Sequence, residues 1–154
     1  MSKAYNVTTL SIFGIILLTI AGCSSKQSKV PAVAISGQVV HINDSIFKLK
    51  IFNYSDLKEW KYAGDLPCIV DFYADWCAPC RQLAPALDEM AKKYEGRLII
   101  YKVDTDKEQL LSQNIGIGSL PTLIFISKTG KPQIARGLIP KDVLEKTINS
   151  ILTN

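Results

Sequence analysis

The spacing of hydrophobic residues predicts alternating strands and helices from about residue 38 onward. The run from Cys68 to Ala74 is almost entirely apolar, which is typical of a buried strand. Residues 78–94 then carry apolar side chains at helical spacing, and Pro85 should kink this helix because it removes one backbone hydrogen bond. The apolar positions of the predicted helix are Leu83, Leu87, Met90, Ala91 and Tyr94.

Before the buried strand, the pattern predicts a hairpin and a short helix. Residues 39–42 and 46–52 have strand-like patterns and flank the turn residues Asn43-Asp44-Ser45. Ser55 should cap a helix that reaches Tyr62, since acidic residues follow in its first turn, where the helix dipole favours them.

The C-terminal half predicts a strand at 98–103 and a helix at 106–114 that stops before Gly116. Residues 120–126 and 133–136 should form a hairpin about Thr129-Gly130. Pro140 should then begin the last helix, because proline is favoured at the first helical position. The shared apolar face of that helix would carry Leu144, Ile148 and Ile151. Strands interleaved with helices indicate a layered α/β fold.

The first residues have the pattern of an export signal. Lys3 precedes an uncharged apolar run from Leu10 to Ile20, which is short for a transmembrane helix. The sequence Ile-Ala-Gly-Cys that ends at Cys23 resembles the bacterial lipobox, whose cysteine is lipid-modified and becomes the first residue of the mature protein. An uncleaved signal anchor, or an ordinary signal peptide with an incidental cysteine, is the alternative. We expect a signal peptide at 1–22, a lipidated tether at 23–37 and a folded domain at 38–154.

Charge excludes one class of partner. Only three of the 18 basic residues precede Ser36, and all 14 acidic residues follow it, so the predicted domain is close to neutral. It therefore lacks the basic surface that nucleic-acid binding needs. About 119 residues from Ser36 onward suffice for one domain with a core, and not for two.

The candidate chemistry lies at Cys77-Ala78-Pro79-Cys80, between the buried strand and the long helix. A helix N-terminus presents unpaired N–H groups and the positive end of the helix dipole, which favour a thiolate at Cys77. Cys80 lies one turn further on, close enough to form a disulfide with Cys77. A structural bridge or half of a zinc site is the alternative. Zinc would need further ligands, and the chain offers only Cys68, Cys23 and His41, so we expect redox chemistry and no metal.

Three further residues are candidates for a role. Asp71 lies in the middle of the apolar strand, where loss of water would raise its pKa and suit it to act as a base near neutral pH. A water-exposed position at a strand end is the alternative. Cys68 should be a buried apolar residue, with a regulatory thiol as the second interpretation, and His41 should point outward from its strand.

From about Ser45 to Leu152 the chain resembles the thioredoxin family. Residues 70–80 resemble the family's active-site strand and turn, and Leu120-Pro121-Thr122 resembles its cis-proline loop. Further positions that match are Pro85, Lys102 and Gly137. The interval between Cys77 and Pro121 leaves no space for the helical insertion of DsbA-type oxidases. Ala78 replaces the usual glycine and Tyr73 a common tryptophan, departures that bear on the redox potential.

The resemblance implies a thioredoxin fold, with a central mixed sheet between helices and an N-terminal extension. It also implies that Cys77 attacks a target disulfide and that Cys80 resolves the mixed disulfide. Asp71 would be the base for Cys80, with Lys102 as its partner. A groove for the client would be bordered by Trp76, Ala78, Pro79, Leu120, Pro121 and Gly137, although core packing is a competing interpretation for Trp76.

The function expected from these residues is reduction of protein disulfides outside the cytoplasm, without a cofactor. The protein would be a monomer, lipid-anchored at Cys23 to the inner or outer membrane, and Ser24 favours the outer one in some bacteria. Its partners would be disulfide-containing clients and a membrane electron donor, because an oxidising compartment does not recharge a reductant. A disulfide oxidase or isomerase, or a binding lipoprotein with a static disulfide, is the alternative.

Overall fold

The computed structural model describes residues 37–56, 59–129 and 132–153. The predicted signal peptide, Cys23 and nearly all of the predicted tether lie outside these ranges. Within the described ranges, no helix combines the length and the apolar character needed to cross a membrane.

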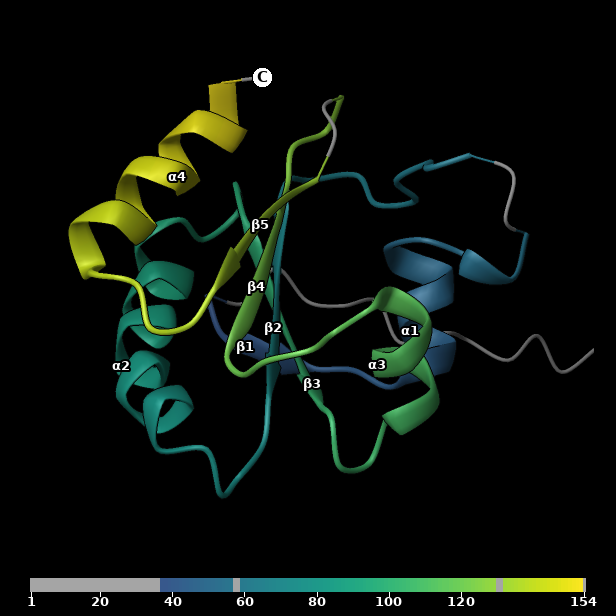
Figure 1. The fold of residues 1–154 in the computed structure, drawn as a ribbon. Helices are drawn as coiled ribbons and strands as arrows, with labels where there is room; N and C mark the ends of the chain where they lie inside the picture. The colour runs from purple at the N-terminus through teal and green to yellow at the C-terminus, as the bar shows by residue number, and fades with distance from the viewer. Residues whose placement is uncertain (1–36, 57–58, 130–131, 154) are drawn as a thin grey trace, which may run out of the picture. The chain divides into compact units, whose positions relative to one another are not determined.

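The centre of the fold is a mixed five-stranded sheet in the order β1-β3-β2-β4-β5 (Figure 1). The strands β1, β3, β2 and β5 run in one direction, and β4 runs antiparallel to its neighbours β2 and β5. Their bounds are β1 Val39–His41, β2 Cys68–Tyr73, β3 Ile99–Asp104, β4 Thr122–Ile126 and β5 Gln133–Arg136. The apolar run predicted from the sequence is therefore the central strand, and all six residues of β2 are buried.

Helices cover both faces of the sheet (Figure 1). α2 (Ala78–Lys93) and α4 (Lys141–Thr153) pack on one face, and α1 (Asp44–Lys50) and α3 (Gln109–Ile115) on the other. Side chains alternate along β2, so that Ile69 joins the core under α2 and α4 while Val70 and Phe72 join the core under α1 and α3.

The helix α2 confirms the long helix predicted after the central strand. Its buried face consists of Cys80, Leu83, Leu87, Met90 and Ala91. Pro79 lies in the first turn, where its missing N–H costs nothing, and the helix continues through Pro85. The fold therefore places the first turn of α2 directly after the end of β2.

The predicted hairpin about Asn43-Asp44-Ser45 is wrong. Asn43 caps α1 instead, because its side chain accepts a hydrogen bond from the backbone N–H of Ile46. Phe47 and Ile51, four residues apart, then lie on one helical face and are almost fully buried. β1 pairs in parallel with β3, so its partner is remote in sequence.

The helix predicted from Ser55 to Tyr62 is also wrong. A 3-10 helix, Tyr54–Asp56, occupies its start, and the described residues 59–62 are not helical. The rings of Phe52 and Trp60 lie 4.7 Å apart, and the N–H of Ala63 donates to the carbonyl of Ile51. These contacts draw the segment back against the end of α1, which a continuous helix could not do.

The C-terminal predictions are largely confirmed. α3 begins three residues later than expected, because the Asp104 carboxylate accepts the N–H of Asp106 and holds a turn there. The helix ends at Gly116, whose φ of 78° suits glycine. The strands β4 and β5 pair as expected, although Gly130 of their turn lies outside the described residues.

Candidate active site

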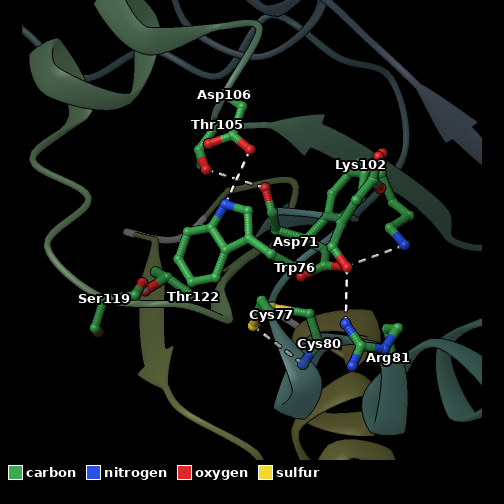
Figure 2. The surroundings of a disulfide bond; sticks show 12 residues. Asp71, Trp76, Cys77, Cys80, Arg81, Lys102, Thr105, Asp106, Ser119 and Thr122 are labelled. Carbon is green, nitrogen blue, oxygen red and sulfur yellow. Dashed lines mark hydrogen bonds and ion pairs between the residues drawn. A yellow bond between two sulfur atoms is a disulfide. The ribbon is translucent and has the colours of Figure 1, made fainter.

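Cys77 and Cys80 form a disulfide at the junction of β2 and α2 (Figure 2). Their Cα atoms are 5.3 Å apart, and both residues are buried. Cys77 is the N-cap of α2, and its sulfur accepts a hydrogen bond from the backbone N–H of Cys80 at 3.2 Å. Once the disulfide is reduced, this N–H and the helix dipole stabilise a thiolate at Cys77.

Asp71 is buried in the middle of β2, with 1% of its surface exposed. Neither carboxylate oxygen has a hydrogen-bond partner among the described residues. Burial raises the pKa of Asp71 to about 6, and the charge of Lys102 opposes this rise. The water-exposed alternative is therefore wrong.

Lys102 lies opposite Asp71 in the pairing of β2 with β3, as the resemblance implied. Its Nζ is 3.8 Å from Oδ2 of Asp71, which makes an ion pair without a hydrogen bond (Figure 2). Alternation along β2 puts Asp71 on the face of Ile69, beneath α2, whose first buried side chain is Cys80. A poorly solvated carboxyl group thus lies in the layer between the sheet and the redox helix.

The peptide bond between Leu120 and Pro121 is cis, as predicted. Leu120 packs against the cluster that contains Cys77 and Cys80. Gly137, with a φ of 83°, donates its N–H to the carbonyl of Pro121 at 2.8 Å and so joins the same loop. The structure therefore brings the predicted proline loop to the disulfide.

Trp76 borders the site from outside, so the core interpretation for this residue is wrong. Its side chain is 69% exposed, and its Nε1 donates to Asp106 at 2.9 Å (Figure 2). Ala78 and Pro79 are also exposed, on the turn between the two cysteines. A cavity of about 250 Å³ is lined by Trp76, Thr105, Ser112, Ile117, Gly118, Ser119 and Leu120.

Cys68 belongs to the opposite face of the sheet, in the core under α1 and α3. It is fully buried, and burial raises the pKa of its thiol to about 12. The regulatory-thiol interpretation therefore lacks the accessible thiolate it needs. In the described part of the chain, no three His, Cys, Asp or Glu side chains are grouped to hold a metal.

Sequence reasoning missed two residues next to Lys102. The Lys102 ammonium lies 4.0 Å from the centre of the Tyr73 ring. The Tyr73 hydroxyl is 3.4 Å from Nδ1 of His41, which is exposed as expected but meets this partner from a strand remote in sequence. Alternation along β1, β2 and β3 would place His41, Tyr73 and Lys102 on one face of the sheet. This can be seen from the sequence only once the parallel pairing of β1 with β3 is known.

The family model, the related sequences and the solved structure that match this chain are all thioredoxins. The family model described as Thioredoxin matches residues 47–150. The chain is 46% identical to thioredoxin of Borreliella burgdorferi, over 71% of this chain and 93% of that one. It is 36% identical to thioredoxin 1 of Nostoc, over 72% and 94% of the two chains. The crystal structure of chloroplastic thioredoxin z superposes with a TM-score of 0.65 at 28% identity, over 76% and 96%.

Proposed function

The chain belongs to the thioredoxin family and is a protein-disulfide reductase, and on that premise we propose that it works outside the cytoplasm as a membrane-anchored lipoprotein. The observation that carries the chemistry is the Cys77–Cys80 disulfide at the start of α2, beside the loop of Leu120 and cis-Pro121. Both partners of the disulfide come from one short turn, so it can open and close without moving the sheet.

The reaction begins with the reduced pair. The Cys77 thiolate attacks one sulfur of a client disulfide, which forms a mixed disulfide and expels the other client sulfur as a thiolate that takes a proton from water. The positive end of α2 and the N–H of Cys80 support the charge on Cys77 before the attack. Exposed Trp76, Ala78 and Pro79 let the client approach this sulfur.

The second step releases the client. Asp71 takes the proton of the Cys80 thiol, and the Cys80 thiolate attacks the sulfur of Cys77. The remaining client sulfur leaves as a thiolate and is protonated, so two electrons have passed to the client and the enzyme is left as the disulfide seen in Figure 2. Asp71 suits this step because burial raises its pKa to about 6, near the pH at which it must accept and return a proton.

The client would bind along the loop of Leu120 and Pro121. An extended segment next to this loop would pair with the backbone of Leu120, in the manner of a strand added to a sheet edge. Gly137 holds the carbonyl of Pro121, so the loop presents a fixed edge. The cavity beside Trp76 would accept a client side chain of modest size.

The sequence supports the location. Lys3, the apolar run from Leu10 to Ile20 and the lipobox-like end at Cys23 have the order of a lipoprotein signal. A reductant in an oxidising compartment is consumed by each turnover, so a membrane electron donor must return two electrons to the Cys77–Cys80 disulfide.

Reduction of insulin by dithiothreitol tests the activity of the full-length protein in detergent. We expect faster precipitation of the insulin B chain than with dithiothreitol alone, and no acceleration by a variant in which Ala replaces both Cys77 and Cys80. The reduction potential of the pair should lie near that of thioredoxin, about −270 mV. A value near the DsbA range, about −120 mV, would identify an oxidase instead.

A further inference from the structure

Four polar side chains form a row across the sheet on the face covered by α2. His41 of β1 is paired with Lys102 of β3, and Lys102 is paired with Asp71 of β2. Tyr73 lies two residues after Asp71 and so on the same face. The row runs from an exposed histidine at the sheet edge to a fully buried carboxyl group.

The carboxyl group does not hold Lys102 in place. The 3.8 Å between Nζ and Oδ2 exceeds hydrogen-bonding distance, and a lysine side chain has several rotamers to choose from. The ammonium also lies over the face of the Tyr73 ring, at 4.0 Å from its centre. A cation is attracted to the negative face of an aromatic ring, and more strongly where water is partly excluded. The Lys102 side chain is only 14% exposed.

The Tyr73 ring is itself fixed from the other side. Its hydroxyl lies 3.4 Å from Nδ1 of His41, and the two rings meet edge to face with centres 5.8 Å apart. Burial, and then the charge of Asp104, raise the pKa of Tyr73, so the hydroxyl keeps its proton and can donate it to Nδ1. His41 thereby sets the plane of the ring on which Lys102 rests.

We propose that Tyr73 and His41 are positioning residues of the thiol chemistry: the Tyr73 ring, oriented by His41, holds the Lys102 ammonium beside the Asp71 carboxylate. The proposal rests on the proposed role of Asp71 as the base for Cys80. Neither residue touches the client or the sulfur atoms in this role. They act by fixing how strongly Lys102 favours the ionised form of Asp71.

The charged and titratable groups that face His41, Lys102, Asp71 and Tyr73 come from several neighbouring elements. On the Asp71 side, the facing groups are Lys102 from β3 and the Cys77–Cys80 pair of α2, since Leu123 of β4 is apolar. On the Tyr73 side, Asp75 also acts on the ring. The shallow cavity of about 250 Å³ beside His41, Tyr73 and Lys102 is lined in addition by Ile42, Asn43, Asp104, Lys107 and Glu108. Asp104 and Lys107 form an ion pair with each other.

The direct test is a titration of the Asp71 side-chain carbon by NMR in the oxidised protein. Loss of the positioned charge should raise the Asp71 pKa, by about 1 unit in Lys102→Met. Tyr73→Leu should raise it by about half as much, because Lys102 is still present but no longer held. Water admitted by the smaller leucine would lower the pKa instead, so the direction separates positioning from loosened packing.

A double-mutant cycle isolates the mechanism. In the Lys102→Met background, Tyr73→Leu should raise the Asp71 pKa no further, because its effect passes through Lys102. The ring-current shift of the Lys102 ε-protons should disappear in Tyr73→Leu and persist in wild type. An Asp71 pKa that does not rise in Tyr73→Leu, or rises equally with and without Lys102, would overturn the proposal.

Tyr54→Leu is the matched control. Tyr54 is as buried as Tyr73, at 9% exposure, and also lies under a lysine, with Nζ of Lys48 at 4.6 Å from its ring centre. It belongs to the core on the opposite face of the sheet, so its replacement should leave the Asp71 pKa unchanged. An equal rise in this control would mean that the shift reflects general loosening, against the proposal.

Two further variants test the role of His41. They also test the proposal if Tyr73→Leu fails to fold. Tyr73→Phe keeps the ring and loses the hydroxyl, and His41→Ala loses the partner. Each should raise the Asp71 pKa by less than Tyr73→Leu, and together they should shift it no more than either alone. No shift in either, or fully additive shifts, would overturn the role of His41.

This titration stays separate from the test of Asp71 as a base. If Asp71→Asn resolved the mixed disulfide at the wild-type rate, the proposed role of Asp71 would fail. The shift of the Asp71 pKa by Tyr73 would still establish or refute the positioning of Lys102, since it is measured without turnover.

Discussion

Individual residues at this site differ in what their surroundings allow them to do. Cys77 receives an N–H hydrogen bond at the start of α2, whereas Cys80 lies inside the first turn. The same helix therefore supports charge on the first sulfur and leaves the second in need of a base. This difference separates the attacking thiol from the resolving one.

Cys80→Ser should accumulate covalent mixed disulfides with client proteins, because attack by Cys77 persists while resolution is lost. Cys77→Ser should trap none. Non-reducing gels of the membrane fraction, followed by mass spectrometry of the adducts, measure this. Cys68→Ala in the Cys80→Ser background is the control and should leave the adducts unchanged, since Cys68 is buried on the other face. Equal trapping by the two serine variants would reverse or remove the assigned roles.

Asp71→Asn should slow the release of the mixed disulfide and leave the first attack by Cys77 nearly intact. The asparagine cannot take the proton of Cys80, and proton transfer of this kind contributes about 10²–10⁴-fold. Single-turnover kinetics with a fluorescent disulfide peptide, followed from pH 5 to 8, resolve the two steps. In the wild type, the rate constant for resolution of the mixed disulfide should increase with pH around the Asp71 pKa of about 6. In Asp71→Asn this increase should be absent.

The same substitution should stabilise the folded domain in a defined pH range. The pKa of Asp71 is raised by folding from an ordinary 3.8 to about 6, so the native state binds the proton more tightly than the unfolded state. Below about pH 3 the carboxyl group is protonated in both states and no penalty exists. As the pH rises from about 3 to 7, the wild type loses about 3 kcal/mol of folding free energy. Urea melts should show Asp71→Asn more stable at pH 7, with the difference vanishing near pH 3. A less stable variant at pH 7 would contradict the burial argument.

The secondary-structure elements show which parts of the fold local sequence can specify. β2 and α2 were predicted because each carries one unbroken pattern, an apolar run and then a helical face that starts at a capping cysteine. With them came both cysteines and Asp71, which are the parts of the site set by neighbours in sequence. The proline loop, which leads into β4, was instead predicted from the family resemblance.

The first elements of the domain could not be predicted in the same way. Asn43 suits a turn and a helix cap equally well, and residues 46–51 satisfy both strand and helix spacing. The choice is made by burial of Phe47 and Ile51 against the sheet and by the pairing of β1 with β3, which are remote in sequence. The contact between His41 and Tyr73 depends on the pairing of β1 with β3. Because the sequence did not predict that pairing, it did not predict the contact either.

Asn43→Ala should destabilise the domain by about 1 kcal/mol, because it removes the side-chain oxygen that accepts the N–H of Ile46. Asn43→Gly should cost only a few tenths of a kcal/mol. Urea melts of both variants give the comparison. Asn53→Ala is the comparison: it also removes an oxygen that accepts a backbone N–H, that of Ser55 at 3.2 Å, but it precedes a short 3-10 helix and not an α-helix. Indistinguishable stabilities of wild type and Asn43→Ala would mean that the cap contributes nothing to α1.

On the scale of the whole molecule, the chain divides its tasks between two parts. The domain that the family model matches at residues 47–150 carries the redox site, and the part before residue 37 carries the residues of the proposed anchor. The chemistry of the site uses no residue of the anchor. Removal of the lipid should therefore change location and leave catalysis alone.

Cys23→Ser should move the protein out of the membrane fraction, as a soluble or an unprocessed form, without changing the insulin-reducing activity of the purified protein. Acyl chains drive stable attachment when two or more are buried, and serine offers no thioether site for the first of them. Carbonate extraction followed by immunoblotting measures the partition, and mass spectrometry of the N-terminus reports processing and acylation. Ser25→Ala, two residues further on, should stay membrane-bound and acylated. If correctly cleaved Cys23→Ser remained at the membrane to the same extent, attachment would have to come from another part of the chain, and the lipoprotein proposal would be abandoned.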